Sequence, residues 1–148
     1  MSTRLDYDRD GAAITRASFA LIRAELGDRL VRFGALEPVV VRMVHAAGDT
    51  GIVDGLEASA AFFTEATAAL RRGATVWCDS EMVARGITRA RLPAGVAVRC
   101  ALGDPEVPEL ARRLGTTRAA AAVECWLGTL DGGLAVVGNA PTALFRLL

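Results

Sequence analysis

The sequence predicts an α/β fold in which a parallel sheet carries helices on its faces. Three short and nearly continuous apolar runs are found at 74–78, 96–102 and 134–138. Segments with helical spacing of apolar residues lie between them, at 59–72, 107–114 and 116–127. Strands that alternate with helices, and that are apolar almost throughout, are typical of a parallel sheet covered by crossover helices.

A helix is predicted to begin after Asp10, whose carboxylate can cap the first turn. Apolar residues follow it with helical spacing, at Ile14, Ala17, Leu21 and Ile22. Ser18 lies inside this stripe. The usual explanation for such a serine is a hydroxyl that bonds back to its own helix, but a polar group on a buried face can also present itself to a ligand.

The segment 37–47 carries signals for both a strand and a helix. Three consecutive valines at 39–41 favour a strand. Pro38 near the start and Gly48 just past the end favour a helix, and we predict a helix on that basis. In a helix, Arg42 and His45 are three residues apart and share a face.

His45 is the only histidine in the chain. With an ordinary pKa of roughly 6.5, its imidazole can exchange a proton near neutral pH. The cationic Arg42 nearby should disfavour the imidazolium and so make its proton easier to donate. We therefore take His45 as the candidate general acid.

The composition argues against several classes of chemistry. All 17 basic residues are arginines, which excludes a Schiff-base lysine and a phosphate-loop lysine. Three cysteines without a CxxC pair, together with a single histidine, argue against a zinc site or a disulfide framework. Neither GxGxxG after a strand nor GxSxG occurs, so a nucleotide cofactor and a hydrolase serine have no support.

The charge and the length bound the partners and the compartment. Seventeen acids balance the arginines, which gives no reason to expect nucleic acid or a membrane surface as partner. The polar start lacks an apolar signal region, and no apolar stretch reaches about 18 residues. We expect a cytoplasmic protein, and 148 residues fit one domain with one core.

Polar residues follow two of the predicted strands, where ligands of parallel sheets gather. The acidic and polar residues 79–82 come after the first strand, and the turn GNAPT at 138–142 comes after the third. Asn139 is placed to cap the final helix, and free N–H groups of the turn could bind a carboxylate or phosphate. The residues 115–118 make a similar helix start, to which Arg118 adds a guanidinium. Ordinary capping explains both turns equally simply.

Several longer blocks carry a resemblance to a known family. They are, in order, YDRDGAAI, SFALIRAE, VRMVHAAG, CDSEMVARGITRARLP, LGTTRAAAA and GNAPTALF. On these blocks the chain resembles precorrin-8X methylmutase, the precorrin isomerase family of cobalamin biosynthesis. The blocks stand in family order and cover essentially the whole chain.

The resemblance implies a three-layer, flavodoxin-like fold, a homodimer with sites near the subunit interface, and no cofactor. It implies an isomerase that moves a methyl group between adjacent carbons of a corrin precursor, precorrin-8X, to give hydrogenobyrinic acid. The catalytic histidine of the family falls on His45. Its substrate-contacting serine and arginine fall on Ser18 and Arg42. The groups that would hold the acid side chains of the macrocycle are Thr117, Arg118, Asn139 and Thr142.

The chain departs from the family at two positions, where Thr15 and Ala47 replace the usual tyrosine and cysteine. Family members also continue past GNAPTALF, so we expect one family domain, 1–148, without the usual C-terminal segment. The unpaired sheet edge and apolar helix face left there predict that the chain is not a monomer. Two other functions stay open: a corrinoid-precursor-binding protein without catalysis, and a generic flavodoxin-like binding module.

Overall fold

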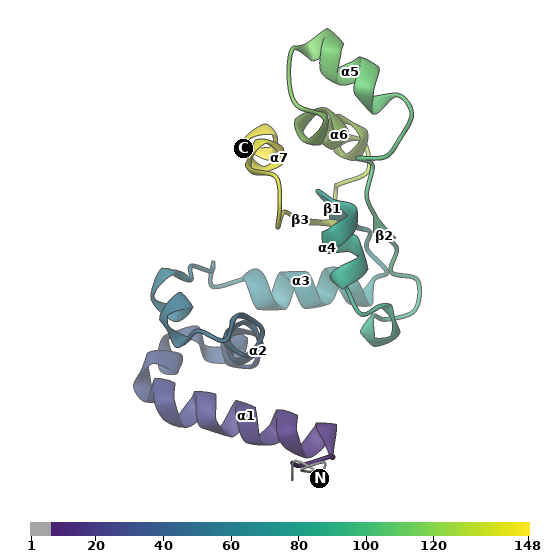
Figure 1. Ribbon diagram of the computed structural model, residues 1–148. Helices are drawn as coiled ribbons and strands as arrows, with labels where there is room; N and C mark the ends of the chain where they lie inside the picture. The colour runs from purple at the N-terminus through teal and green to yellow at the C-terminus, as the bar shows by residue number, and fades with distance from the viewer. Residues whose placement is uncertain (1–6) are drawn as a thin grey trace, which may run out of the picture. The chain divides into compact units, whose positions relative to one another are not determined.

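The computed structural model describes residues 7–148, and Figure 1 shows its helices and strands. The chain divides between Phe63 and Thr64 into two compact units. In its described part the first unit contains helices and loops but no strand, whereas the second holds a three-stranded parallel sheet with helices. The mixed α/β class predicted from the sequence is therefore confirmed.

Four helical elements build the first unit: α1 (Gly11–Leu26), η1 (Gly27–Leu36), α2 (Glu37–Ala47) and η2 (Thr50–Gly55). Helix α1 begins where the sequence predicts, because the Asp10 carboxylate accepts hydrogen bonds from the backbone N–H groups of Ala12 and Ala13. The apolar stripe proposed for α1 is only partly correct. Of its four residues only Ile22 is buried, whereas Ile14, Ala17 and Leu21 are exposed. Leu26, which the stripe did not include, is also buried. The buried face of α1 is the one that packs against α2 and η1.

Helix α2 forms in spite of its three consecutive valines. Pro38 lies in its first turn, and Gly48 ends it in the left-handed region at φ 65°. Val40, Val41 and Val44 are all buried in the core of the first unit. Burial of three β-branched side chains outweighs their modest intrinsic cost in a helix, which is a few tenths of a kcal/mol for each residue.

The second unit contains the other elements, and α3 extends across its boundary with the first unit. They are α3 (Phe62–Arg71), β1 (Val76–Cys78), α4 (Glu81–Gly86), η3 (Arg89–Arg91), β2 (Val98–Arg99), α5 (Val107–Leu114), α6 (Arg118–Leu127), β3 (Leu134–Val136) and α7 (Pro141–Leu147). The strands are shorter than the apolar runs that predicted them. They pair in the order β2-β1-β3, and both pairings are parallel.

Alternation along β1 places helices on both faces of the sheet. Val76 and Cys78 point to one face, where they pack against residues of α3 and α4. Trp77 points to the opposite face and stacks on Trp126 of α6, with ring centroids 6.0 Å apart. Helices α5, α6 and α7 pack on that second face. The three layers expected from the sequence are thus present.

Residues 7–148 include no helix that is both long and apolar enough to span a membrane.

Candidate functional site

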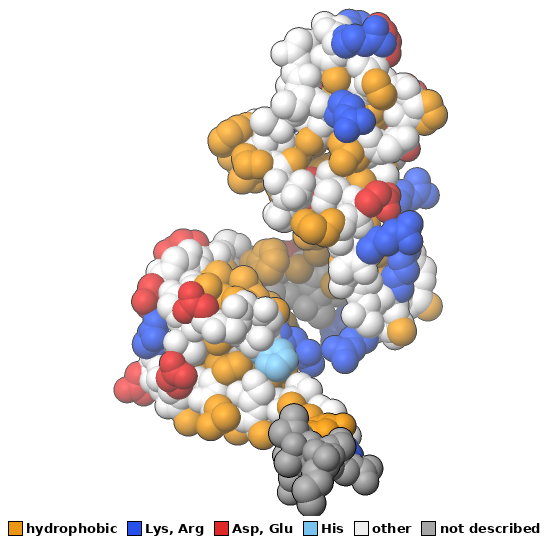
Figure 2. All heavy atoms as spheres, in the orientation of Figure 1, with side chains coloured by type: hydrophobic (Ala, Val, Ile, Leu, Met, Phe, Trp, Pro, Cys, Tyr) orange, Lys and Arg blue, Asp and Glu red, His pale blue; other side chains and the backbone are white. Residues whose placement is uncertain are grey.

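The first candidate group is a hydrogen-bonded pair that joins two helices of the first unit. Ser18 Oγ on α1 lies 2.8 Å from His45 Nδ1 on α2. The Ser18 hydroxyl therefore reaches across to α2 and does not bond back to α1. In α1 that local bond is made by Thr15, whose hydroxyl donates to the Gly11 carbonyl. Figure 2 shows the single histidine, in pale blue, exposed on the surface.

The Phe19 ring connects the two functional side chains of α2. It meets the His45 ring edge-on, with centroids 5.2 Å apart and an angle of 81° between the planes. The guanidinium carbon of Arg42 lies 5.3 Å from the centroid of Phe19. Arg42 and His45 thus share a face, as predicted from their spacing. Phe19 itself was not predicted, although its place beside Ser18 in the α1 sequence was a usable signal.

The hydrogen bond to Ser18 distinguishes the two ring nitrogens of His45. Nδ1 is engaged by the hydroxyl, so Nε2 is the nitrogen left to exchange a proton with a bound molecule. In the imidazolium, the form that can act as an acid, Nδ1–H donates to the Ser18 hydroxyl and the proton on Nε2 is the one available for transfer. An edge-on aromatic neighbour also limits rotation of the imidazole. The arrangement suits a proton donor held in one orientation.

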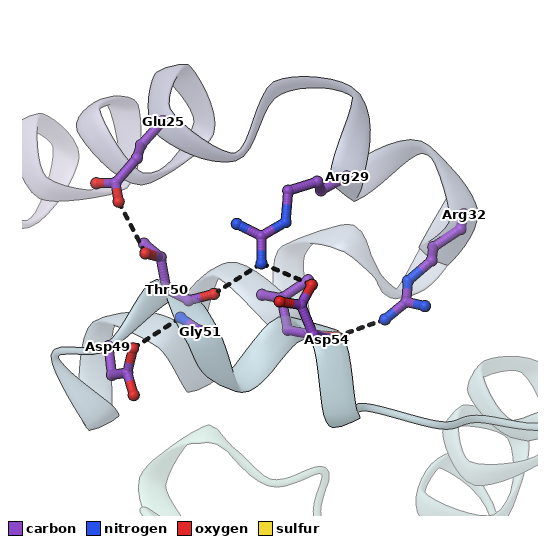
Figure 3. A network of polar contacts seen from close by, with 8 residues as sticks. Glu25, Arg29, Arg32, Asp49, Thr50, Gly51 and Asp54 are labelled. Carbon is purple, nitrogen blue, oxygen red and sulfur yellow. Dashed lines mark hydrogen bonds and ion pairs between the residues drawn. The ribbon is translucent and has the colours of Figure 1, made fainter.

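A polar network fastens the segment that follows His45 (Figure 3). Helix α2 ends at Gly48, and Asp49 then caps η2 by accepting the N–H of Gly51 at 2.7 Å. Three further contacts tie η2 to the preceding helices: Thr50 donates to Glu25 at 2.7 Å, Arg29 binds Asp54 at 2.7 Å, and Arg32 donates to the Val53 carbonyl at 2.5 Å. These contacts hold η2 in place, and η2 directly follows the C-terminal end of α2, where His45 lies.

The second candidate group lies at the carboxyl end of β1 in the second unit. Asp79 directly follows that strand and is only 1% exposed. Its carboxylate accepts three backbone N–H groups of the turn before α7, from Gly138 at 3.3 Å, Asn139 at 2.8 Å and Ala140 at 2.6 Å. The sequence indicated a polar residue at this strand end but did not predict this bonding.

Two expectations for the GNAPT turn are wrong. Asn139 does not cap α7, because the N-cap position is Ala140, which has no side chain able to accept a hydrogen bond. The N–H groups expected to be free for an external anion are already taken by the Asp79 carboxylate. A buried carboxylate is stable only with hydrogen-bond donors, and buried N–H groups require an acceptor. The Asp79 carboxylate and the N–H groups of the turn meet both requirements.

Thr117 and Thr142 meet at the starts of α6 and α7. Thr117 caps α6 by accepting the N–H of Ala120 at 3.2 Å, and its hydroxyl lies 2.8 Å from that of Thr142. The Arg118 and Asn139 side chains are exposed beside these helix starts. Within the range 7–148, no ion pair involves Arg118. The contact between the threonine hydroxyls brings the starts of α6 and α7 together, which the sequence did not predict.

A possible set of metal ligands lies elsewhere in the second unit. One oxygen each of Asp104 and Glu106 and the sulfur of Cys125 lie within 4.8 Å of one another. Burial, followed by the negative charge of Glu106, raises the pKa of the Cys125 thiol.

Comparisons with known proteins agree on one family. The sequence profile of the precorrin-8X methylmutase family matches residues 13–148. Precorrin-8X methylmutase from Sinorhizobium sp is 52% identical over 97% of this chain and 68% of its own length. The enzyme of that name from Pseudomonas aeruginosa is 50% identical over 97% and 69%. A cobalt-precorrin-8 methylmutase from Methanothermobacter thermautotrophicus is 34% identical over 93% and 64%.

A solved structure supports the same relationship. Precorrin-8x methyl mutase from Thermus thermophilus superposes with a TM-score of 0.77 and 36% identity, over 93% of this chain and 66% of that one. The chain therefore spans about two thirds of the length of the proteins it matches.

Proposed function

The chain belongs to the precorrin-8X methylmutase family, isomerases of cobalamin biosynthesis, and on this premise we propose that it converts precorrin-8X to hydrogenobyrinic acid. The reaction moves a methyl group between adjacent carbons of the corrin precursor. The observation that carries the proposal is the Ser18–His45 pair, which leaves one imidazole nitrogen available for proton transfer. We further propose the cytoplasm as its location, since its three cysteines are free thiols.

His45 acts as the general acid in this proposal. As one carbon–carbon bond breaks and the neighbouring one forms, Nε2 delivers a proton to the conjugated ring system. The product is an isomer of the substrate, so the macrocycle must return a proton and His45 is restored. Ser18 and Phe19 contribute by keeping the imidazole in the orientation for this transfer.

The other predicted site residues bind the substrate, which is a polycarboxylate. Arg42 is exposed and lies on the same face of α2 as His45, so its guanidinium can hold a carboxylate near the proton donor. Ser18 keeps the substrate-contacting role implied by the resemblance. We assign further acid side chains of the macrocycle to Thr117, Arg118, Asn139 and Thr142.

We propose the cobalt-free compound as the substrate. The relatives that share 50–52% identity are named precorrin-8X methylmutase, whereas relatives named cobalt-precorrin-8 methylmutase share 30–37%. Parallel assays with precorrin-8X and with its cobalt complex test this choice. A clear preference for the cobalt complex would contradict it.

The function is tested by incubating the purified chain with precorrin-8X and following the absorption spectrum. His45→Ala should lower the turnover rate by about 10²- to 10⁴-fold, the range for a general acid, while the substrate still binds. An alanine variant that remains fully active would rule out His45 as the donor. A spectral shift on binding without product, in the unmodified chain, would favour the precursor-binding alternative. Preference for a nucleotide over tetrapyrroles would favour the generic module.

A further inference from the structure

We propose that Asp79 is a positioning residue for substrate binding: its buried carboxylate holds the GNAP turn so that Thr142 faces Thr117. The proposal rests on the proposed function, since it takes the two threonines as substrate-binding groups. Asp79 itself is 1% exposed, which leaves its carboxylate no surface for a substrate. Its influence on the site passes through the turn.

The first step of the argument is how firmly Asp79 is bound. One carboxylate oxygen accepts the N–H of Gly138, and the other accepts those of Asn139 and Ala140. In the described part of the chain, Asp79 forms no ion pair with an arginine. Its charge is therefore stabilised by backbone donors, and a buried carboxylate without them would be very costly. Asp79 and the turn cannot separate without leaving both unsatisfied.

The second step is the short connection from the turn to the threonine pair. Ala140, which makes the shortest of the three bonds, is the N-cap of α7. Pro141 follows and restricts its own φ, and Thr142 comes next. The Thr142 hydroxyl then lies 2.8 Å from that of Thr117. Because Thr142 is only two residues after Ala140, a shift of Ala140 would also move the Thr142 hydroxyl relative to that of Thr117.

The third step is that the turn is also confined from its other side. A Cβ atom on Gly138 would lie 2.9 Å from Cγ2 of Val83 on α4. The N–H groups of the turn are thus bound by the Asp79 carboxylate, and Val83 leaves no room for a side chain at Gly138. Such a turn has one well-defined position, which is what a preorganised binding group requires.

The chain offers a matched control in the next residue, Ser80. It is also buried, at 6% exposed, and it is a polar side chain with a structural task, because it caps α4 by accepting the N–H of Val83 at 3.4 Å. Ser80→Ala should lower stability without releasing the turn. The Ser80→Ala variant therefore shows how a loss of stability alone affects substrate binding, when the GNAP turn is still held by Asp79.

The test compares Asp79→Asn with Ser80→Ala. An asparagine keeps the shape but turns an NH₂ group toward backbone donors, so at least one N–H of the turn loses its acceptor. We expect KM for precorrin-8X to rise about tenfold with little change in kcat, and the amides of Asn139 and Ala140 to exchange faster with solvent. Ser80→Ala should leave KM within about twofold.

A double-mutant cycle with Thr142→Val shows whether Asp79 acts through the turn. Once Thr142 lacks its hydroxyl, Asp79→Asn should raise KM much less than in the unmodified chain, whereas Ser80→Ala and Thr142→Val should be additive. Additive effects of Asp79→Asn and Thr142→Val would overturn the proposal. So would an unchanged KM in Asp79→Asn.

A second variant covers the case in which Asp79→Asn does not fold. Gly138→Ala leaves Asp79 intact but pushes the turn off Val83, so KM should rise, and Val83→Ala added to it should restore KM. A rise that Val83→Ala does not reverse would contradict the proposal. If the unmodified chain fails to convert precorrin-8X, the proposed function is wrong. Amide exchange in Asp79→Asn then still decides whether Asp79 holds the turn, and unchanged exchange would refute it.

Discussion

At the scale of single residues, the main feature is an imidazole held by a hydroxyl from another helix. Ser18 and His45 are 27 positions apart in the sequence and 2.8 Å apart at Oγ and Nδ1. Ser18→Ala should lower kcat by about two- to tenfold, the equivalent of one neutral hydrogen bond, because the ring loses its orientation. Steady-state kinetics on the unmodified chain and on Ser18→Ala measures the change in kcat.

Ser18→Thr is the matched control, since it keeps a hydroxyl at the same position and should retain most of the activity. In the His45→Ala background, Ser18→Ala should have no additional effect on kcat, because the two residues act together. An independent effect of Ser18→Ala on kcat in that background would contradict the prediction.

The thiol of Cys78 gives a prediction about pH. Cys78 is completely buried, and burial, followed by the charge of Cys100, raises its pKa from 9.0 to about 11. As pH rises, the Cys78 thiol therefore stays protonated to a higher pH in the folded state than in the unfolded state. The stability this provides is complete below about pH 9 and is lost as pH rises toward 11. Urea denaturation between pH 8 and 11 should show the decline, and Cys78→Ala should reduce its slope.

At the scale of elements, β3 depends on a glycine just before it. A Cβ on Gly133 would lie 2.9 Å from the Thr75 carbonyl oxygen and 3.0 Å from that of Leu130. Thr75 also accepts the N–H of Leu134, so it belongs to the pairing of β3 with β1. Gly133→Ala should cost about 1–3 kcal/mol in the free energy of unfolding, as overpacking does.

Gly128→Ala is the control for this prediction. Gly128 ends α6 with a negative φ, and a Cβ there would meet nothing within 4 Å. The alanine should leave stability within about 0.5 kcal/mol, the range of neutral surface changes. Thermal denaturation of both variants measures the difference. An equal loss of stability in Gly133→Ala and Gly128→Ala would mean that the structure around Gly133 accommodates the added Cβ atom, which would contradict the prediction.

At the scale of the whole molecule, oligomerisation is the open prediction. Among the described strands, β3 lies at an edge of the sheet, and Phe145 on the following helix is 71% exposed. Because proteins normally cover an unpaired edge beside an apolar surface, we expect a dimer. Light scattering should report twice the mass of one chain, and Phe145→Ser should shift it toward the monomer. Leu21→Ser, equally exposed on α1, should leave the mass unchanged. A monodisperse monomer would contradict the prediction.

The sequence by itself determined the fold class and the bounds of several helices, but not α4 or the short helices η1, η2 and η3. Asp10, Pro38 and Gly48 mark the ends of helices through bonds and backbone angles within a few residues, so they act in the same way in any tertiary setting. The shared face of Arg42 and His45 follows from helical geometry alone. The order of apolar runs and helices likewise implied parallel strands.

Only the tertiary structure decided which distant groups meet. The face of α1 that is buried depends on where α2 packs, so Leu21 is exposed and Ser18 reaches His45. The acceptor for the N–H groups of the GNAP turn is likewise remote in sequence. Asp79 lies about 60 positions before them, and it fills a role that local rules assigned to Asn139 or to an external anion. Contacts of this kind arise from packing across the chain, and no short pattern of residues encodes them.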